Sequence, residues 1–332
     1  MSQVRLSASR IKTAQECSWK YWAEYHLKLR GGGNSGSGRG NCCHPVLEAL
    51  LRPDRKPYYE EILKNQDVYS VPAIKRMIHI LAKKNEVFDE ENLALVNDFL
   101  LRGLSLDFYC EGALSVQSEF AFEEKNEKLW TLGYIDKIAT YIDKVLIIDY
   151  KTQKNFFTQE ELEFNIQAML YVMVARKMFP DKKVEFEFHQ LKEGVENEGR
   201  GKNKITTILN PVQKVPPISD TTLEGFKEWL YEYSKYLENF DINTAKSNFA
   251  SKDFLLKRMR CGGELGQRRK SDGQLMFCCD KKYPFLYFAL MENGVLLETS
   301  KDREVLEKKA KTGQEIIQKS YSGCPSFSYL WE

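Results

Sequence analysis

The sequence predicts an α/β fold: a mixed central sheet flanked by helices, with a helical region before it and a small α+β appendix after it. Three observations lead to this prediction. The spacing of apolar residues is helical up to about residue 110 and changes to a strand pattern at about residue 113. The elements then follow in the order strand, strand, strand, helix, strand. Residues 251–332 have a pattern of their own, with a strand hairpin and a charged helix.

The first part of the chain is expected to be mostly helical. Apolar side chains recur at spacings of three and four over residues 7–29, which predicts an amphipathic helix. The run GGGNSGSGRG at 31–40 is expected to be a flexible loop, because glycine and serine dominate it. A short helix that carries His44 is expected to begin near Asn41. Two further helices are expected at 72–84 and 89–109.

The central region is rich in β-branched and aromatic residues with strand alternation. After three strands we expect a long helix at 159–179 and a strand at 184–191. Residues 193–220 are expected to be loop-like with one possible strand at 204–209, and a helix at 221–239 follows. The three strands before the long helix are expected at 115–124, 128–141 and 144–151.

We expect two domains. Residues 1–240 would form the larger one, with a helical insertion at about 41–110 and a core at about 111–191. Residues 241–332 would form a cysteine-containing appendix. Its elements are expected to be a hairpin of strands 285–290 and 295–300 and a charged helix at about 302–319.

The charge balance argues against a protein that coats nucleic acid. Lys and Arg number 49 against 47 Asp and Glu, for a formal net charge of +2, whereas coating proteins usually have a larger basic excess. The balance is uneven, however, because residues 1–60 and residues 251–282 each have a local net charge of +5. This distribution is compatible with a DNA partner that binds in a restricted basic groove.

The lack of a recognisable membrane span or secretory signal, together with the cysteine usage, predicts a cytoplasmic protein. No run of about 18 apolar residues that could cross a membrane occurs, and the N-terminus lacks the apolar core of a secretory signal. Eight cysteines without an export signal favour a reducing compartment. We therefore expect the cytoplasm of a bacterium, or of its host cell if the chain is phage-encoded, and no membrane partner.

The most informative stretch is GYIDKIATYIDKVLIIDYKTQK at 133–154. If the hairpin turns at Ile142-Asp143, partner residues have numbers that sum to 285, and Asp136 lies opposite Asp149 on one face. Two facing carboxylates in apolar strands repel each other and are costly to desolvate, whereas a divalent cation reverses both effects. Lys151 lies two residues further on the same face, where it can orient a water or stabilise charge on a phosphate. The alternative is a solvated edge hairpin on which these charges have no function.

This pattern resembles the PD-(D/E)XK nuclease superfamily and, within it, the RecB-type exonuclease branch. That branch includes nuclease subunits of bacterial recombination complexes and a CRISPR-adaptation nuclease. The likeness is in a strand with G-x-I-D, a hairpin, I-D-Y-K-T and a helix with Q-x-x-x-Y, over about residues 5–190. Ile135 stands where the superfamily name has proline, a departure common in the branch. The resemblance implies a restriction-endonuclease-like core. The matching residues are Gly133, Ile135, Asp136, Asp149, Tyr150, Lys151, Thr152, Gln167 and Tyr171, with Gly40, His44 and Glu48 before them and Ser7, Ser9, Arg10, Ile11, Cys17, Lys20 and Tyr21 near the N-terminus.

The resemblance also implies roles for these residues. Asp136 and Asp149 would be catalytic and metal-binding, His44 would be a further ligand, and Lys151 would be the catalytic lysine. Gln167 and Tyr171 would shape the site and contact the nucleic-acid backbone. Glu119 on the preceding strand is a possible extra acid. Without the resemblance, His44 and Glu119 would be ordinary helix and strand residues, and Gln167 and Tyr171 ordinary positions of a packing helix.

The cysteines leave three alternatives open. Some members of the branch hold a [4Fe–4S] cluster with one N-terminal cysteine and three after the core, and Cys17 stands where the first would be. Cys261, Cys278 and Cys324 are the possible later ligands, with Cys279 also available, but their spacing is loose. The stretch from Arg260 to Pro284 could instead be a zinc ribbon that has lost half its ligands. The third alternative is plain thiols without a metal.

The sequence thus predicts a metal-dependent DNA exonuclease that uses Mg²⁺ or Mn²⁺ to hydrolyse phosphodiester bonds in recombination, repair or phage DNA processing. Its partners would be single-stranded DNA or duplex ends and, because the chain has no G-x-x-x-x-G-K-[ST] motif, a separate helicase or recombination protein as motor. Two alternatives remain: a non-catalytic binding or scaffold protein of the same fold, and a restriction-type or RNA-acting nuclease.

Overall fold

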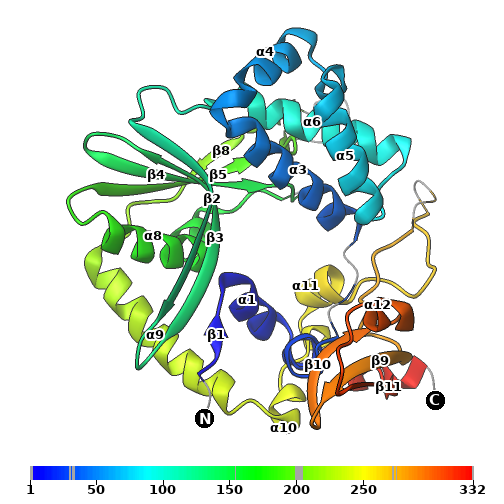
Figure 1. The fold of residues 1–332 in the computed structure, drawn as a ribbon. Coiled ribbons are helices and arrows are strands. Elements are labelled where there is room, and N and C mark those ends of the chain that lie inside the picture. The colour runs from blue at the N-terminus through cyan, green and yellow to red at the C-terminus, as the bar shows by residue number, and fades with distance from the viewer. Residues whose placement is uncertain are drawn as a thin grey trace. The chain divides into compact units, whose positions relative to one another are not determined.

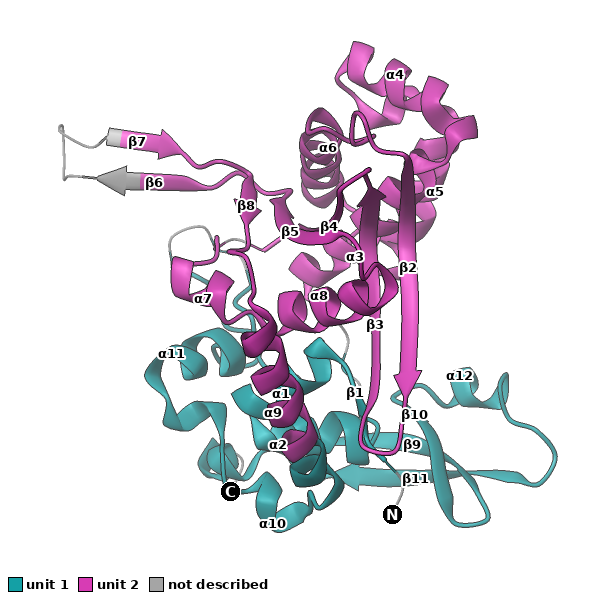
Figure 2. Ribbon diagram, turned by 90° about the vertical axis from the view of Figure 1, so that its left-hand side faces the viewer, with its two compact units in different colours: residues 1–32, 234–332 teal, residues 33–233 magenta. Residues whose placement is uncertain are grey.

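The computed structural model describes residues 3–29, 31, 34–153, 155–198, 205–270, 273 and 275–330. The chain forms two compact units, coloured separately in Figure 2. One comprises residues 1–32 and 234–332, and the other comprises residues 33–233. This grouping differs from the expected division after residue 240, because residues 1–32 and 234–240 belong to the same unit as the C-terminal residues. The two units are described in turn.

The 33–233 unit contains a mixed sheet with the strand order β2–β3–β4–β5–β8 (Figure 1). β4 and β5 are parallel, whereas the β2–β3, β3–β4 and β5–β8 pairs are antiparallel. These strands agree with the predicted α/β fold and with the four predicted strands of the core. Their bounds are β2 Ser115–Lys125, β3 Trp130–Thr140, β4 Lys144–Lys151, β5 Lys183–Gln190 and β8 Val212–Lys214, and a separate antiparallel pair is formed by β6 Val195–Glu198 and β7 Ile205–Ile208.

The β3–β4 hairpin has the register that the sequence predicts. Lys137 pairs with Ile148, and Thr140 pairs with Val145, so that the partner numbers sum to 285. β4 is almost wholly buried, as its run of apolar residues indicates. Asp136 comes just before Lys137, the first residue of this pairing, so the register places Asp136 next to the end of β4.

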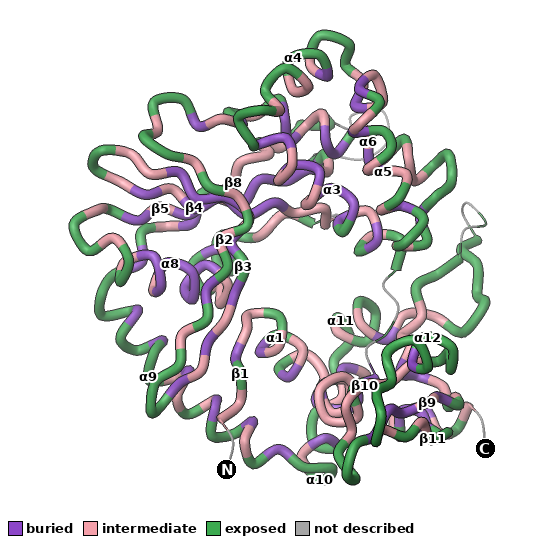
Figure 3. The backbone as a smooth tube through the Cα atoms, in the orientation of Figure 1, coloured by how far each residue is buried: buried purple, intermediate pink, exposed green. Residues whose placement is uncertain are grey.

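Four helices pack on one face of this hairpin and form a common core with it (Figure 1). Their buried side chains contact Ala139, Ile148 and Tyr150 of β3 and β4. Figure 3 shows the buried residues concentrated where these elements meet. The helices are α3 Ser35–Leu51, α4 Lys56–Asn65, α5 Pro72–Lys84 and α6 Glu90–Ser105.

The predicted loop at 31–40 is wrong over its second half, because α3 begins at Ser35 and not near Asn41. Asn34 caps the helix by accepting a hydrogen bond from the Ser37 amide. A Cβ atom on Gly38 would lie 2.7 Å from Val87 Cγ1 and 2.9 Å from the Asn85 carbonyl oxygen. The glycines therefore allow close packing of the helix, which composition alone does not distinguish from flexibility.

Gly38→Ala is expected to destabilise the protein by about 1–3 kcal/mol, because the added methyl group meets a backbone carbonyl that cannot move away freely. Gly225 is the matched control: it lies in α9, and a Cβ atom there has nothing within 4 Å. Gly225→Ala should stabilise by up to about 1 kcal/mol, because alanine favours the helix. Urea unfolding of both variants measures the difference. Equal effects would show that Gly38 is not a packing position.

The predicted helix at 159–179 is two helices, α7 Gln159–Glu163 and α8 Ile166–Met178. Asn165 interrupts it, because its side chain accepts hydrogen bonds from the amides of Gln167 and Ala168 and so starts a new helix. α8 contacts β4 and β5. α9, at Asp220–Glu238, follows the sheet as predicted for 221–239.

The other unit combines N-terminal helices with a three-stranded antiparallel sheet in the order β10–β9–β11. The hairpin of β9 and β10 is confirmed, but the predicted helix at 302–319 is wrong: only α12 is helical, and β11 follows and pairs with β9. Gly313, at φ 87°, lies between them. The predicted helix at 7–29 is broken at Cys17, which has extended backbone. The elements are β1 Arg5–Leu6, α1 Ala8–Glu16, α2 Ser18–Tyr21, α10 Ile242–Ala245, α11 Phe254–Leu256, β9 Phe285–Glu292, β10 Val295–Ser300, α12 Arg303–Glu307 and β11 Gln314–Tyr321.

Within the described residues, no helix is both long enough and apolar enough to span a bilayer.

Candidate active site

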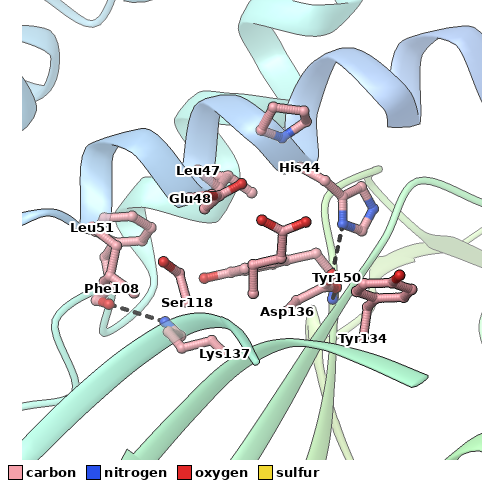
Figure 4. Close-up of a pocket in the computed structure, with 12 residues that line it drawn as sticks. His44, Leu47, Glu48, Leu51, Phe108, Ser118, Tyr134, Asp136, Lys137 and Tyr150 are labelled. Carbon is pink, nitrogen blue, oxygen red and sulfur yellow. Dashed lines mark hydrogen bonds and ion pairs between the residues drawn. The ribbon is translucent and has the colours of Figure 1, made fainter. Parts of the chain in front are cut away.

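Two strands and one helix bring His44 and Asp136 together. Asp136 lies on β3 just before the paired part of the β3–β4 hairpin, and its Oδ1 atom is 3.0 Å from Nδ1 of His44 on α3. Its other oxygen, Oδ2, accepts a hydrogen bond of 2.8 Å from the Tyr150 amide of β4. Figure 4 shows the His44–Asp136 contact at one end of a pocket. The carboxylate is therefore fixed between a helix and the neighbouring strand.

A second set of contacts joins the end of β4 to α8. Nζ of Lys151 lies 2.6 Å from Oδ2 of Asp149 and donates a hydrogen bond of 2.7 Å to Oε1 of Gln167. The Gln167 amide group donates a hydrogen bond of 2.6 Å to Oδ1 of Asp149. Asp149, Lys151 and Gln167 thus form a closed triangle of polar contacts, and the Asp149 side chain is almost fully buried.

Tyr171 anchors this triangle to β3. Its hydroxyl donates a hydrogen bond of 2.9 Å to the Tyr134 carbonyl and accepts one of 3.3 Å from Gln167. Gly133 is needed for this arrangement, because a Cβ atom there would lie 2.5 Å from the Phe122 ring and 2.7 Å from the Tyr171 ring. The glycine of the G-x-I-D pattern therefore has a packing role. Gln167 and Tyr171 position other groups in addition to any contact with a substrate.

The two aspartates affect each other electrostatically. Burial raises the pKa of Asp149, and the negative charge of Asp136 raises it further, whereas Lys151 acts in the opposite direction. For His44, burial disfavours the charged imidazolium, but the hydrogen bond and the negative charge of Asp136 outweigh it and raise the pKa. The cluster thus places two carboxylates beside two groups that can be cationic, Lys151 and His44.

A pocket of about 120 Å³ lies next to Asp136 and extends between α3 and β2. Burial and the neighbouring carboxyl group of Glu119 raise the pKa of Glu48 in it. Glu119, the predicted extra acid, has a φ of 46° within β2, an unusual conformation for a residue with a side chain. The buried Tyr150 hydroxyl has no hydrogen-bond partner among the described residues. The pocket is lined by His44, Pro45, Leu47, Glu48, Leu51, Phe108, Ser118, Glu119, Tyr134, Asp136, Lys137 and Tyr150 (Figure 4).

Sequence reasoning missed two features of this site. Asn165 starts α8 and so aligns Gln167 with Asp149; the Asn-Ile-Gln sequence before an apolar run is an N-cap signal that could have been recognised. The contact of Glu48 with Glu119 joins a helix to a strand some seventy residues later, and no spacing rule predicts it.

The family model of the PD-(D/E)XK nuclease superfamily matches residues 5–242. The chain belongs to the PD-(D/E)XK nuclease superfamily. Its mixed sheet with flanking helices is the restriction-endonuclease-like fold of that superfamily, as the sequence predicts. Membership implies nuclease activity in general and, for the superfamily as a whole, the use of Mg²⁺ or Mn²⁺ and DNA.

No curated protein matches the chain. Among solved structures, the crystal structure of protein VC1899 from Vibrio cholerae is similar at 11% sequence identity and a TM-score of 0.22. The match covers 74% of this chain and 59% of that one, so the chain spans less than two thirds of the length of that protein.

The carboxylates of Asp136 and Asp149 fit a hard divalent cation. Oδ2 of Asp149 is a buried carboxylate oxygen that has the Lys151 ion pair but no well-oriented hydrogen bond to any described residue. Carboxylate oxygens are the ligands that Mg²⁺ and Mn²⁺ favour. In the described part of the chain, no three His, Cys, Asp or Glu side chains form a group that could hold a metal ion as they stand. A cation bound here would compete with Lys151 for Oδ2 of Asp149.

All eight cysteines are free thiols, and four of them lie close enough to influence one another in the unit of residues 1–32 and 234–332. Burial, followed by the neighbouring thiols Cys17, Cys279 and Cys261, raises the pKa of Cys324 to about 12. Cys279 interacts with Cys17, and its amide donates a hydrogen bond to the Cys261 carbonyl. Cys17, Cys261, Cys279 and Cys324 thus lie near one another, and Cys278 is close to Cys261, but among the described residues no three of them are arranged so that they could hold a metal ion.

Proposed function

We propose that the protein is a metal-dependent DNA exonuclease of the RecB-type branch. The observation that carries the proposal is the juxtaposition of Asp136 on β3 with Asp149 and Lys151 at the end of β4, with one buried Asp149 oxygen lacking a hydrogen bond. Asp136, Asp149 and His44 would hold Mg²⁺ or Mn²⁺. When bound, the ion supplies a water of lowered pKa and neutralises charge on the scissile phosphate.

The side chains have separate tasks in this proposal. Lys151, once released from Asp149, donates hydrogen bonds to the phosphate or to the attacking water. Gln167 holds Asp149 in its orientation through Oδ1 and leaves Oδ2 for the ion. Tyr171 fixes the position of Gln167 relative to β3, because its hydroxyl group bonds to both. The bacterial cytoplasm and recombination, repair or phage DNA processing are the setting we infer, in agreement with eight free thiols.

The test of the proposal compares substrates. Purified protein with Mn²⁺ should degrade linear DNA and leave covalently closed circular DNA and RNA intact. Cutting of circular DNA would identify a restriction-type enzyme, and preferential cutting of RNA would identify an RNA-acting one. Binding of DNA without any cutting would favour a non-catalytic protein of the same fold. A separate helicase as partner would show as faster digestion of long duplexes when it is added.

For the cysteines we propose a [4Fe–4S] cluster held by Cys17, Cys261, Cys324 and either Cys278 or Cys279. Burial raises the pKa values of Cys261, Cys279 and Cys324, so these three thiols stay protonated without a metal, whereas a cluster would stabilise the thiolates. Protein purified without oxygen should be brown and contain about four irons. Cys279→Ser and Cys278→Ser distinguish the fourth ligand by their iron content. Bound zinc without iron would indicate the ribbon, and neither metal would indicate plain thiols.

A further inference from the structure

The segment from Lys252 to Phe277, in the unit of residues 1–32 and 234–332, presents apolar side chains to solvent. Phe254 is 81% exposed, Leu265 is 75% exposed and Leu255 is 65% exposed. Single exposed apolar residues are ordinary, but a cluster of them in one short segment marks an interaction surface. In the described part of this segment, the exposed apolar residues are Phe254, Leu255, Met259, Leu265, Leu275, Met276 and Phe277.

The exposed charged side chains of the same segment are mostly positive. Its exposed acidic side chains in the described residues are Asp253 and Glu264. Arg260 is only partly exposed. The exposed cations are Lys252, Lys257, Arg258, Arg268, Arg269 and Lys270. Six cations against two acids, in a chain of net charge +2, make this the complement of a polyanion.

A backbone contact within this segment holds Phe277 close to the end of the helical turn. α11 continues into a helical turn over Lys257–Cys261, and the chain then folds back so that the Gly263 amide donates a hydrogen bond of 2.8 Å to the Phe277 carbonyl. Gly262, at φ 66°, makes this possible, because a Cβ atom there would lie 2.0 Å from the same carbonyl oxygen. Phe277 is thereby held against the end of the helical turn that carries Arg258. Figure 3 shows much of the segment after α11 in the colour of exposed residues.

We propose that the surface formed by the residues of these two lists, here called the 252–277 surface, binds single-stranded DNA outside the catalytic unit. Phosphates would contact the lysines and arginines, and unpaired bases would stack on Phe254 and Phe277 and cover the aliphatic side chains. A duplex offers phosphates but hides the faces of its bases, so it leaves the exposed rings without a partner. The choice of DNA rests on the proposed function; the preference for a single strand rests on the apolar residues.

The test measures binding of a labelled oligothymidine strand by fluorescence anisotropy, using the full chain with Asp149→Asn and without divalent metal, so that nothing is cut. Phe254→Ser should weaken binding about 5- to 150-fold, the range expected for the loss of one stacked base. The double variant Lys257→Glu/Arg258→Glu should flatten the dependence of log affinity on log salt by at least about 1.4, which corresponds to two lost phosphate contacts on a single strand. The matched control is Lys308→Glu/Lys311→Glu, which makes the same change of charge at exposed positions of the same unit.

Each outcome decides the question. The proposal is supported if both surface variants lose affinity for the strand, the control does not, and the wild type binds the duplex of the same sequence more weakly. Equal affinity for duplex, or equal losses in surface and control variants, overturns it. Vesicles that contain phosphatidylserine test the other polyanion: vesicle binding that the surface variants lose, with strand binding unchanged, would assign the surface to a membrane and overturn the proposal. A protein that binds the strand through this surface but cuts no nucleic acid refutes the nuclease function alone.

Discussion

Asp149→Asn is expected to reduce DNA cleavage by roughly a thousandfold or more, because it removes a carboxylate whose contribution through a bound metal amounts to several kcal/mol of transition-state stabilisation. The fold should survive. Burial raises the pKa of Asp149, so the ionised side chain is a cost to the folded state at neutral pH, and a neutral amide of the same shape removes that cost. Single-turnover cleavage of linear DNA in Mn²⁺ measures the rate, and thermal unfolding measures the stability.

Asp143→Asn provides the control for this experiment. Asp143 lies in the exposed turn of the same hairpin, so its substitution makes the same chemical change away from His44 and Lys151. It should leave the cleavage rate within about twofold. If Asp149→Asn cuts DNA as fast as Asp143→Asn, the proposed active site is wrong, even though the chain belongs to the PD-(D/E)XK nuclease superfamily.

The part of the fold that could be predicted is the part in which local pattern and tertiary packing agree. The alternation in β3 and β4, with the turn at Ile142-Asp143, fixes the register that places Asp136 near the end of β4. At Gly38 the local pattern and the tertiary packing disagree. Glycine favours a loop locally, but here it lies in a helix, where close packing against Val87 leaves no room for a side chain. In β11, charged residues at helical spacing belong to an edge strand whose pairing with β9 decides its structure.

The same distinction holds for the site. Asp136, Asp149, Lys151 and Gln167 follow from strand geometry and helical spacing together with the resemblance. Their hydrogen bonds do not, because Lys151 could pair with either aspartate or with solvent, and only the tertiary structure selects Asp149. Likewise, the pairing of Glu48 with Glu119 depends on how α3 lies over β2, for which a single sequence carries no signal.

Lys151→Met is expected to separate catalysis from metal binding. Cleavage should fall about 10²- to 10⁴-fold, the usual loss when a group that stabilises developing charge or transfers a proton is removed. At alkaline pH, binding of Mn²⁺ should be as tight as in the wild type or tighter, because Nζ of Lys151 lies 2.6 Å from the Asp149 oxygen that the ion needs, and methionine does not compete for it. Isothermal calorimetry with Mn²⁺ measures the affinity.

The pH dependence of that affinity has a definite sign. Lys151 lowers the pKa of Asp149 against the effect of burial, so its loss raises that pKa further, and protons then compete with Mn²⁺ at a higher pH than in the wild type. Lys144→Met, on the same strand, serves as control because Lys144 pairs with Glu185 and not with Asp149. Should Lys151→Met bind Mn²⁺ more weakly than Lys144→Met even at alkaline pH, the lysine would support the metal site instead of competing for it. Catalysis would then require the Lys151–Asp149 contact to persist in the metal-bound enzyme, which contradicts the release of Lys151 from Asp149 proposed above.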